Sequence, residues 1–161
     1  MDPVTDLEAI GRIGLALLAG AAIGLEREHR DKPAGLRTYA LVCEGAALFM
    51  IASLMLGDHV RATGQTVYDP SRIGSTIVQG IGFLAGGVIL TSGGRIRGLT
   101  TAAGIWVTAS VGLLIGAGLY VVAFAGTAAT LLVLVVLQSV EQRFFSTRKV
   151  RQRSPYLPPD A

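Results

Sequence analysis

From Gly98 to Val140 the chain runs for 43 residues without a single Asp, Glu, Lys or Arg. As one straight helix this run would be ~65 Å long, whereas the hydrocarbon core of a bilayer is ~30 Å thick. A soluble domain carries charge at ~25% of its positions, but this chain carries only 16% and is 51% hydrophobic. The run therefore predicts two membrane-spanning helices that fold back on each other. Gly116 and Gly118 supply helix breakers for the turn, and Tyr120 suits the membrane interface.

Three further segments have the length and composition of membrane spans, which need ~20 predominantly apolar residues. The five predicted spans are Leu7–Leu25, Thr38–Leu56, Ile73–Leu90, Leu99–Ala117 and Leu119–Leu137. We expect an all-α integral membrane protein, with a transmembrane domain over residues 1–140 and a basic, disordered cytoplasmic tail over 141–161. The acidic N-terminus lacks the basic region of a cleaved signal peptide, so we expect the first span to be retained.

Lys and Arg residues are distributed unequally between the predicted loops. Eleven fall on one side, within 27–37, 95–97 and 143–153, and two, Arg61 and Arg72, fall on the other. Because cytoplasmic loops carry the excess of basic residues, the N-terminus is predicted outside and the C-terminus in the cytoplasm. The same distribution explains the net charge of +3 without a nucleic-acid partner.

The first two spans weakly resemble the next two. Gly35-Leu-Arg-Thr38 parallels Gly98-Leu-Thr-Thr101, and each segment follows an Ala-Gly pair and a basic loop. One interpretation is a parallel duplication of helical hairpins with a fifth helix added, as in some transporters. The other is a chance likeness between glycine-rich segments. In either case both turns are expected to begin helices whose positive dipole ends face the cytoplasm, capped by Thr38, Thr100 or Thr101.

Arg27, Arg37, Arg95 and Arg97 flank these two helix starts. Helix N-termini and guanidinium groups together favour an anion, whether a phosphate, a lipid headgroup or the protein's own carboxylates. With the three threonines, these arginines are predicted to form a cytoplasmic mouth that contacts an anion or a partner protein.

Carboxylates interrupt the first basic loop at Glu26, Glu28 and Asp31. Magnesium prefers oxygen ligands and keeps several waters, so one or two carboxylates can hold it. The interleaved basic residues favour a hinge of salt bridges instead, and both interpretations remain open. Glu44, two turns into the second span, is a further candidate cation ligand or proton carrier, because an intramembrane carboxylate is a functional hypothesis by default. The alternative is a protonated or hydrogen-bonded carboxyl.

Glu8 and Arg12 lie four residues apart near the outer end of the first span, the spacing of an ion pair on one helix face. Arg12 lies deeper and needs a partner inside the bundle, because an unpaired cation there costs ~3 kcal/mol. Together with Glu44 and Gln79 of the third span, these two residues are the intramembrane polar candidates for an ion path.

Three Gly-x3-Gly pairs offer small faces for close helix packing. They are Gly20 with Gly24, Gly82 with Gly86, and Gly112 with Gly116. Catalysis has little support. Two histidines are predicted on opposite sides of the membrane, and the chain has neither a nucleophilic-serine motif nor a zinc-protease motif. We predict that the protein is not an enzyme.

Three motifs carry a family resemblance. They are Gly24-Leu-Glu-Arg-Glu28 with Ala34-Gly-Leu-Arg-Thr38, then Gly80-Ile-Gly-Phe-Leu-Ala-Gly-Gly-Val-Ile89, then Arg97-Gly-Leu-Thr-Thr-Ala-Ala103. In this order and topology they resemble the N-terminal membrane domain of the MgtC/SapB family, over residues 8–140. The resemblance implies a protein of the bacterial inner membrane that serves magnesium homeostasis and, in pathogens, survival inside host cells.

The family resemblance leaves the molecular role open. One expectation is a component of a Mg²⁺ transporter, and the other is a non-transporting regulator that binds a partner membrane protein such as the ATP synthase. Longer members carry a soluble C-terminal cytoplasmic domain, which this chain is expected to lack. Some members have Asn where Thr100 stands and a small or apolar residue where Glu44 stands, so no family role is transferred to either. Because a single copy of 161 residues can hardly enclose a pore, we expect a homo-oligomer, first of all a dimer.

Overall fold

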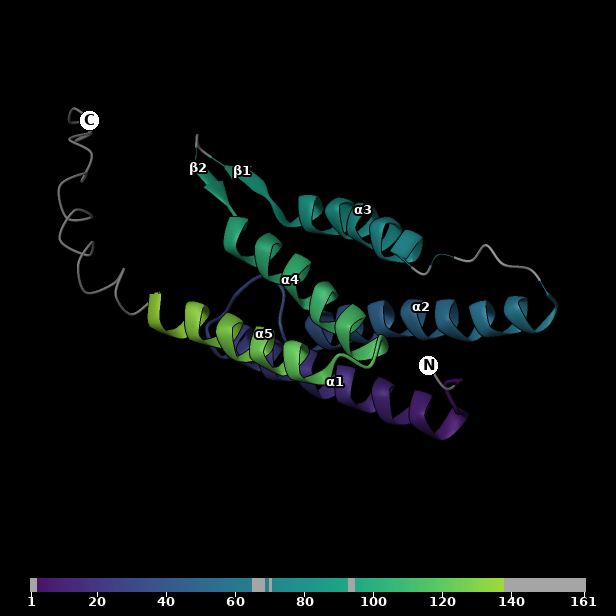
Figure 1. The fold of residues 1–161 in the computed structure, drawn as a ribbon. Coiled ribbons are helices and arrows are strands. Elements are labelled where there is room, and N and C mark those ends of the chain that lie inside the picture. The colour runs from purple at the N-terminus through teal and green to yellow at the C-terminus, as the bar shows by residue number, and fades with distance from the viewer. Residues whose placement is uncertain (1–2, 65–68, 70, 93–94, 138–161) are drawn as a thin grey trace, which may run out of the picture.

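The computed structural model describes residues 3–64, 69, 71–92 and 95–137. Within these residues, five α-helices follow one another, and a short β-hairpin joins the third to the fourth (Figure 1). The helices are α1 (Asp6–His29), α2 (Leu36–Ala62), α3 (Ser71–Val88), α4 (Leu99–Gly116) and α5 (Tyr120–Leu132), which the π-helical segment η1 (Val133–Leu137) extends. Strands β1 (Leu90–Ser92) and β2 (Arg95–Arg97) pair antiparallel, with Thr91 opposite Ile96. The predicted tail, 141–161, lies outside the described residues.

Four of the described helical segments are long and apolar enough to cross a membrane: α1, α2, α4 and Tyr120–Leu137. The chain is therefore a multi-pass membrane protein. The third predicted span forms a helix, α3, but it is less apolar because Arg72, Gln79 and five glycines interrupt it. It also ends at Val88, two residues before the predicted Leu90, and a β-hairpin of two three-residue strands interrupts the predominantly helical fold there. The Gly-Gly pair after Ser92 is a hairpin turn signal between two short strands.

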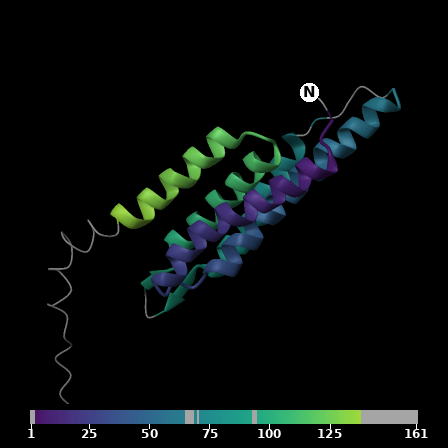
Figure 2. The ribbon, with the colours of Figure 1, turned by 90° about the horizontal axis from the view of Figure 1, so that it is seen from below.

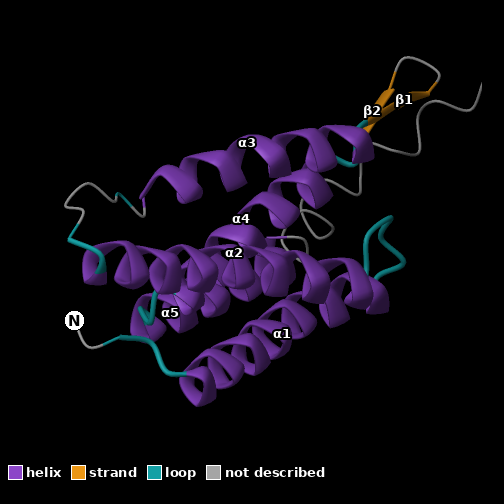
Figure 3. Ribbon diagram, turned by 90° about the vertical axis from the view of Figure 1, so that its right-hand side faces the viewer, coloured by secondary structure: helices purple, strands orange, loops and turns teal. Residues whose placement is uncertain are grey.

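The described helices lie side by side along the long direction of the molecule and form three layers (Figures 1 and 3). Helices α1, α2 and α4 pack together at the centre, α3 packs mainly on α4, and α5 covers α4 and part of α1. Figure 3 shows α3 on one side of α2 and α4, with α1 on the other. In Figures 1 and 2 the 30–35 loop, the β-hairpin and the end of α5 gather at one end, which we call the basic end. The N-terminus and the α4–α5 turn lie at the opposite end.

Small residues bring the central helices close together. Gly20 and Gly24 of α1 face α2, and a Cβ added at Gly20 would lie 2.7 Å from the Cβ of Cys43. Gly112 and Gly116 of α4 approach the backbone of α2 in the same way. Two of the three predicted glycine faces thus lie against α2, because only a residue without a side chain allows backbones this near.

The third predicted glycine face does not pack on any of the residues that the structure describes. Gly82 and Gly86 are exposed, and a Cβ added at either would meet no heavy atom within 4 Å. Helix α3 instead turns Ile81 and Ala85 into the hydrophobic core. Residues four apart lie on the same face of a helix, so Ile81 and Ala85 share the face that packs on the core. Gly82 and Gly86 each follow one residue later and therefore lie on a different face of α3.

Both Gly-Leu turns begin helices, as predicted. Helix α2 starts at Leu36 after Gly35, and α4 starts at Leu99 after Gly98, whose φ of 88° suits glycine. The predicted capping by Thr38, Thr100 or Thr101 was wrong, since neither helix start has a capping hydrogen bond from a threonine. The two turns follow different connections, a short loop and a β-hairpin, and the duplication stays a prediction.

Candidate functional site

A hollow of about 830 Å³, lined by both charged and apolar residues, opens at the basic end. The 30–35 loop, the β2–α4 turn and the end of α5 meet around it. Its lining consists of Arg27, Asp31, Lys32, Pro33, Ile96, Arg97, Gly98, Leu99, Thr100, Thr101, Val133, Leu134 and Leu137. The structure thus gathers Arg27, Arg97 and two threonines of the predicted mouth around one cavity, and adds a wall from α5 that the sequence did not indicate.

The hollow has an excess of positive charge. Arg27, Lys32 and Arg97 line it against a single lining carboxylate, Asp31. Arg27 is only 2% exposed, and its Nε lies 3.3 Å from Glu26, whose other oxygen lies 3.0 Å from Nε of Arg30. Glu26 is therefore shared between two guanidinium groups, and the predicted hinge of salt bridges forms here.

Glu28 closes the start of α2. Its Oε2 accepts a hydrogen bond of 2.8 Å from the backbone N–H of Leu36. The first N–H groups of a helix lack intrahelical partners, and a carboxylate there also meets the positive end of the helix dipole. One of the protein's own carboxylates thus occupies the helix start that the sequence suggested for an anion.

The structure does not assemble a metal centre from the four predicted carboxylates. Glu26 is ion-paired, Glu28 caps α2, Asp31 lines the hollow, and Glu44 lies within α2. Among the described residues, no group of three or more His, Cys, Asp or Glu side chains is placed to hold a metal ion. The oxygen ligands that Mg²⁺ prefers are therefore not brought together in one copy.

Tyr39 does not line the hollow, but it ties α2 to Thr101, a lining residue in the first turn of α4. Its side chain is fully buried, and its hydroxyl donates to the carbonyl of Thr101 over 3.2 Å. The ring lies against Gly104, where a Cβ would collide with it. The start of α4, which lines the hollow, is thereby fixed to α2.

Two members of the predicted mouth lie apart from the hollow. Arg37 and Thr38 are exposed on the first turn of α2 and do not line the cavity. Arg95 lies in β2, and its side chain lies outside what the structure describes.

At the opposite end, Arg12 joins α1 to the end of α4. Its Nη2 pairs with Oε1 of Glu8 at 2.5 Å, and its Nη1 donates to the carbonyl of Gly116 at 2.5 Å. The predicted i,i+4 pair forms, and the partner inside the bundle is the end of α4. A cation at a helix C-terminus satisfies a free carbonyl and meets the negative end of the dipole. Arg12 thus holds α1 against the α4–α5 turn.

The other two intramembrane polar candidates do not contact Arg12. Glu44 is half-buried in α2, and its side chain makes no hydrogen bond or ion pair with the residues that the structure describes. Gln79 is exposed on α3. The predicted polar seam through Arg12, Glu44 and Gln79 is therefore not joined by contacts in one copy.

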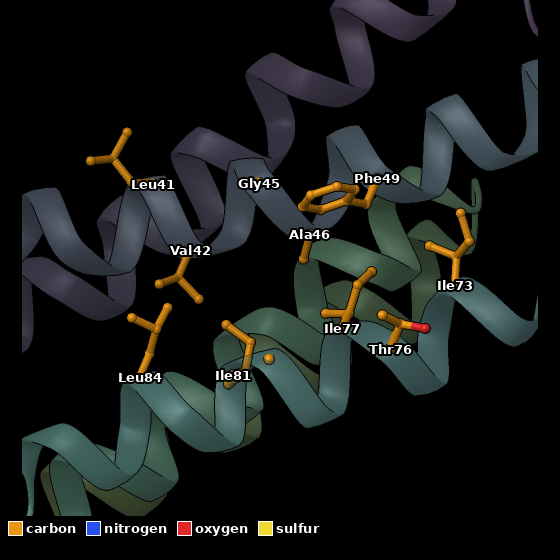
Figure 4. A pocket seen from close by; sticks show the side chains of 11 residues that line it. Leu41, Val42, Gly45, Ala46, Phe49, Ile73, Thr76, Ile77, Ile81 and Leu84 are labelled. Atoms are coloured by element: carbon orange, nitrogen blue, oxygen red, sulfur yellow. The ribbon is translucent and has the colours of Figure 1, made fainter.

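A second cavity, of about 730 Å³, separates α2 from α3 and is almost wholly apolar. In Figure 4, Val42 and Phe49 of α2 face Ile77, Ile81 and Leu84 of α3 across it. Such a lining suits a hydrocarbon chain or another helix. Its one side-chain oxygen, Oγ1 of Thr76, already donates to the carbonyl of Arg72 over 3.0 Å.

Sequence reasoning missed Lys32, the cap made by Glu28 and the wall formed by the end of α5. The cap had a local signal, since Glu28 precedes the predicted helix start by only eight residues. The wall had none, because Val133, Leu134 and Leu137 reach the hollow only through the packing of α5 on α4 and α1.

Comparison with known proteins places the chain in a family. The MgtC family model matches residues 13–143. The chain is 46% identical over 139 residues to an Escherichia coli K12 protein named "Putative magnesium transporter YhiD", covering 86% of this chain and 65% of that protein. An uncharacterized Synechocystis protein is 44% identical over 131 residues, covering 81% and 53%. Protein MgtC of Salmonella typhimurium LT2 is 43% identical over 128 residues, covering 80% and 52%.

The chain thus spans about half to two thirds of the length of these curated relatives. No solved structure matches it. The family match covers four of the five described helices completely and most of α1, and it includes every residue that lines the basic hollow. The chain is therefore a multi-pass membrane protein that belongs to the MgtC family.

Proposed function

We propose that this protein serves magnesium homeostasis in the bacterial inner membrane, as a five-span protein with its N-terminus outside and its basic end in the cytoplasm. Family membership supports the process, and the Escherichia coli relative carries magnesium transport in its name. The orientation is supported by the position of the basic residues. Arg27, Lys32 and Arg97 line the basic end, and the sparser Arg61 and Arg72 border the 63–70 connection.

The packing of α3 supports a fifth crossing. Helices α3 and α4 each have 18 residues, which makes each ~27 Å long, close to the ~30 Å of the hydrocarbon core. The β-hairpin between them makes the two helices antiparallel neighbours. A helix that runs beside a span between the same two ends of the molecule crosses the same layer.

We infer that a single copy acts as a regulator through its basic end and does not conduct ions. The inference rests on buried polar side chains that already form hydrogen bonds within the protein. Arg12 holds the end of α4, and Tyr39 holds its start. Thr108 and Thr127 donate to carbonyls of their own helices. A conduction path needs polar groups from several helices at matching depth, and these groups are already bonded to protein.

A transporter component is the second candidate, favoured by Glu44. An intramembrane carboxyl without a described partner is unusual, because such groups are costly in the membrane and mark ion or proton pathways. A second copy would have to supply the remaining ligands, so this role requires an oligomer. The exposed Gly82 and Gly86 face of α3 supports close packing of such a copy.

Flux measurements separate the two candidates. The purified full chain is placed in liposomes that contain a magnesium-sensitive dye, and a Mg²⁺ gradient is imposed, with an ionophore as positive control. We expect the dye signal to match that of protein-free liposomes. Flux above this level that disappears in Glu44→Gln and survives in Gln79→Ala would contradict the regulator role and support transport.

The magnesium role itself is tested in cells. A bacterium that lacks its own MgtC-family gene is grown in low magnesium while it expresses this chain. We expect growth to be restored by the unchanged chain and by Glu44→Gln. The double change Arg95→Gln and Arg97→Gln is expected to abolish restoration while the protein stays folded in the membrane. Failure of the unchanged chain, at normal membrane levels, would contradict the magnesium role.

A further inference from the structure

The two Gly-Leu helix starts differ in what occupies them. At α2 the carboxylate of Glu28 accepts from the N–H of Leu36. At α4 the preceding residue is Gly98, and no described side chain caps the first turn. The first helical hydrogen bond of α4 is made by Ala102 to Gly98, so the N–H groups before it have no intrahelical partner. These residues line the basic hollow.

A buried cation faces the same hollow. Arg27 lines the cavity and is 2% exposed. Its Nε lies 3.3 Å from Glu26 without forming a hydrogen bond, and both oxygens of Glu26 are likewise without a hydrogen-bond partner among the described residues. Glu26 also pairs with Arg30, so this one carboxylate is shared by two guanidinium groups. With Lys32 and Arg97 against Asp31, the cavity has a net attraction for an anion.

One part of the lining is apolar and comes from a candidate membrane span. Val133, Leu134 and Leu137 form one wall where η1 reaches the basic end. A cationic rim beside an apolar wall at the membrane boundary matches a phosphate group attached to hydrocarbon. Basic pockets between transmembrane helices on the cytoplasmic side bind anionic lipid headgroups in this way.

We propose that the basic hollow binds the phosphate group of an anionic phospholipid. Arg27, Lys32, Arg97 and the free N–H groups of α4 hold the phosphate, and the end of α5 holds the glycerol and the first part of the acyl chains. The proposal does not depend on the magnesium role, because binding rests on the cavity alone.

Native mass spectrometry of the full chain in a non-ionic detergent tests the proposal. We expect retention of phosphatidylglycerol and no retention of phosphatidylcholine with the same acyl chains. Arg97→Gln is expected to lower the apparent affinity for phosphatidylglycerol about fivefold. Arg37→Gln is the matched control, since Arg37 is an exposed basic residue at the same end that does not line the hollow. Equal retention of both lipids, or equal losses in the two variants, would overturn the proposal.

A second variant pair keeps the test independent of folding defects. Thr100→Glu gives the first turn of α4 its own carboxylate, as Glu28 does for α2, and a negative charge there favours the helix. We expect this variant to fold as stably as the unchanged chain by circular dichroism while it loses phosphatidylglycerol. Thr100→Gln should keep the lipid. Undiminished lipid retention in Thr100→Glu would contradict the placement of the phosphate.

Competition with inorganic phosphate tests whether the bound phosphate group belongs to a lipid or to a soluble ion. We expect millimolar phosphate to leave bound phosphatidylglycerol in place, because it has nothing to contact the apolar wall. Displacement by free phosphate that depends on Arg97 and not on Arg37 would overturn the lipid assignment and make a soluble phosphate the occupant.

Discussion

Charged residues next to the membrane close helix ends in this protein. Glu28 accepts from the first turn of α2, and Arg12 donates to the last turn of α4. Each charge has the sign that the adjacent end of the helix dipole favours. Their position in the sequence, among other charged residues, would equally fit a metal site or an ion path. What separates these interpretations is the backbone group that each side chain contacts.

Removal of the Glu28 cap should destabilise the protein. We expect Glu28→Ala to lower the free energy of unfolding by ~1 kcal/mol, the usual cost of a lost helix cap. Reversible unfolding in mixed detergent, followed by circular dichroism, measures the change. Asp31→Asn is the control, since Asp31 is exposed, has a φ of 51° that Asn tolerates, and makes no described side-chain hydrogen bond. Stabilisation by Mg²⁺ that Glu28→Ala abolishes would show a metal ligand in place of a cap.

Loss of Arg12 should cost more than loss of its acidic neighbour. Arg12→Met removes a buried charged hydrogen bond to Gly116, which is worth ~1.5–3 kcal/mol of stability. Glu8→Gln is expected to change stability by less than ~1 kcal/mol, because the Glu8 side chain is 45% exposed. The same unfolding measurement applies to both variants. A larger loss in Glu8→Gln would mean that the ion pair, and not the link to α4, is the main contribution.

Between helices, contact is close at the centre of the bundle and loose at α3. Glycines bring α1 and α4 against the backbone of α2, whereas a Cβ added at Gly82 or Gly86 of α3 would meet nothing within 4 Å, and an apolar cavity separates α3 from α2. The same Gly-x3-Gly spacing thus has two different structural outcomes. The face that a helix turns to its neighbours decides between them.

Alanine substitutions at matched glycines should show this difference. Gly20→Ala places a Cβ 2.7 Å from the Cβ of Cys43, so the helices must separate, and we expect a loss of ~1–3 kcal/mol in unfolding free energy. Gly82→Ala meets open space and improves helix propensity, so the stability of the single copy should stay the same or rise. Equal losses of unfolding free energy in the two variants would contradict the open space around Gly82. A selective loss of dimer in Gly82→Ala would support the proposed oligomer.

The sequence predicted helices well and their tertiary contacts poorly. The turn after Gly116 and the helix starts at Leu36 and Leu99 were predictable because charge, glycine and apolar length act locally. The burial of Arg27 and the wall from Leu134 were not, because they depend on which helices pack together. The threonine caps were predicted from residue type alone, but Glu28 occupies the first site from a distance of eight residues.

At the scale of the whole molecule, the two ends differ in charge and in shape. Basic side chains and an open hollow mark one end, and the α4–α5 turn held by Arg12 marks the other. Orientation in the membrane therefore decides whether the hollow meets the cytoplasmic leaflet, where anionic lipids are abundant. The proposed lipid site requires the orientation that the basic residues indicate.

Cysteine labelling tests the orientation. Cys43 is the single cysteine and is fully buried, so it should not react with a membrane-impermeant maleimide. We expect His59→Cys to be labelled on intact spheroplasts, and Arg37→Cys to be labelled only after the membrane is opened. His59 and Arg37 are exposed residues near the two ends of α2. The reverse pattern would place the basic end outside and contradict the proposed topology.

The contact between Arg12 and Gly116 also has a consequence for how the protein is made. The two residues are separated by 104 positions, so a ribosome that adds ~5–20 residues per second reaches the acceptor roughly 5–20 s after the donor. Until then the guanidinium has only Glu8, one turn away on the same helix, to offset its charge. We expect the first span to stay near the headgroups until the fourth helix supplies this carbonyl. A chain truncated before residue 116 is then expected to leave its first helix shallowly inserted.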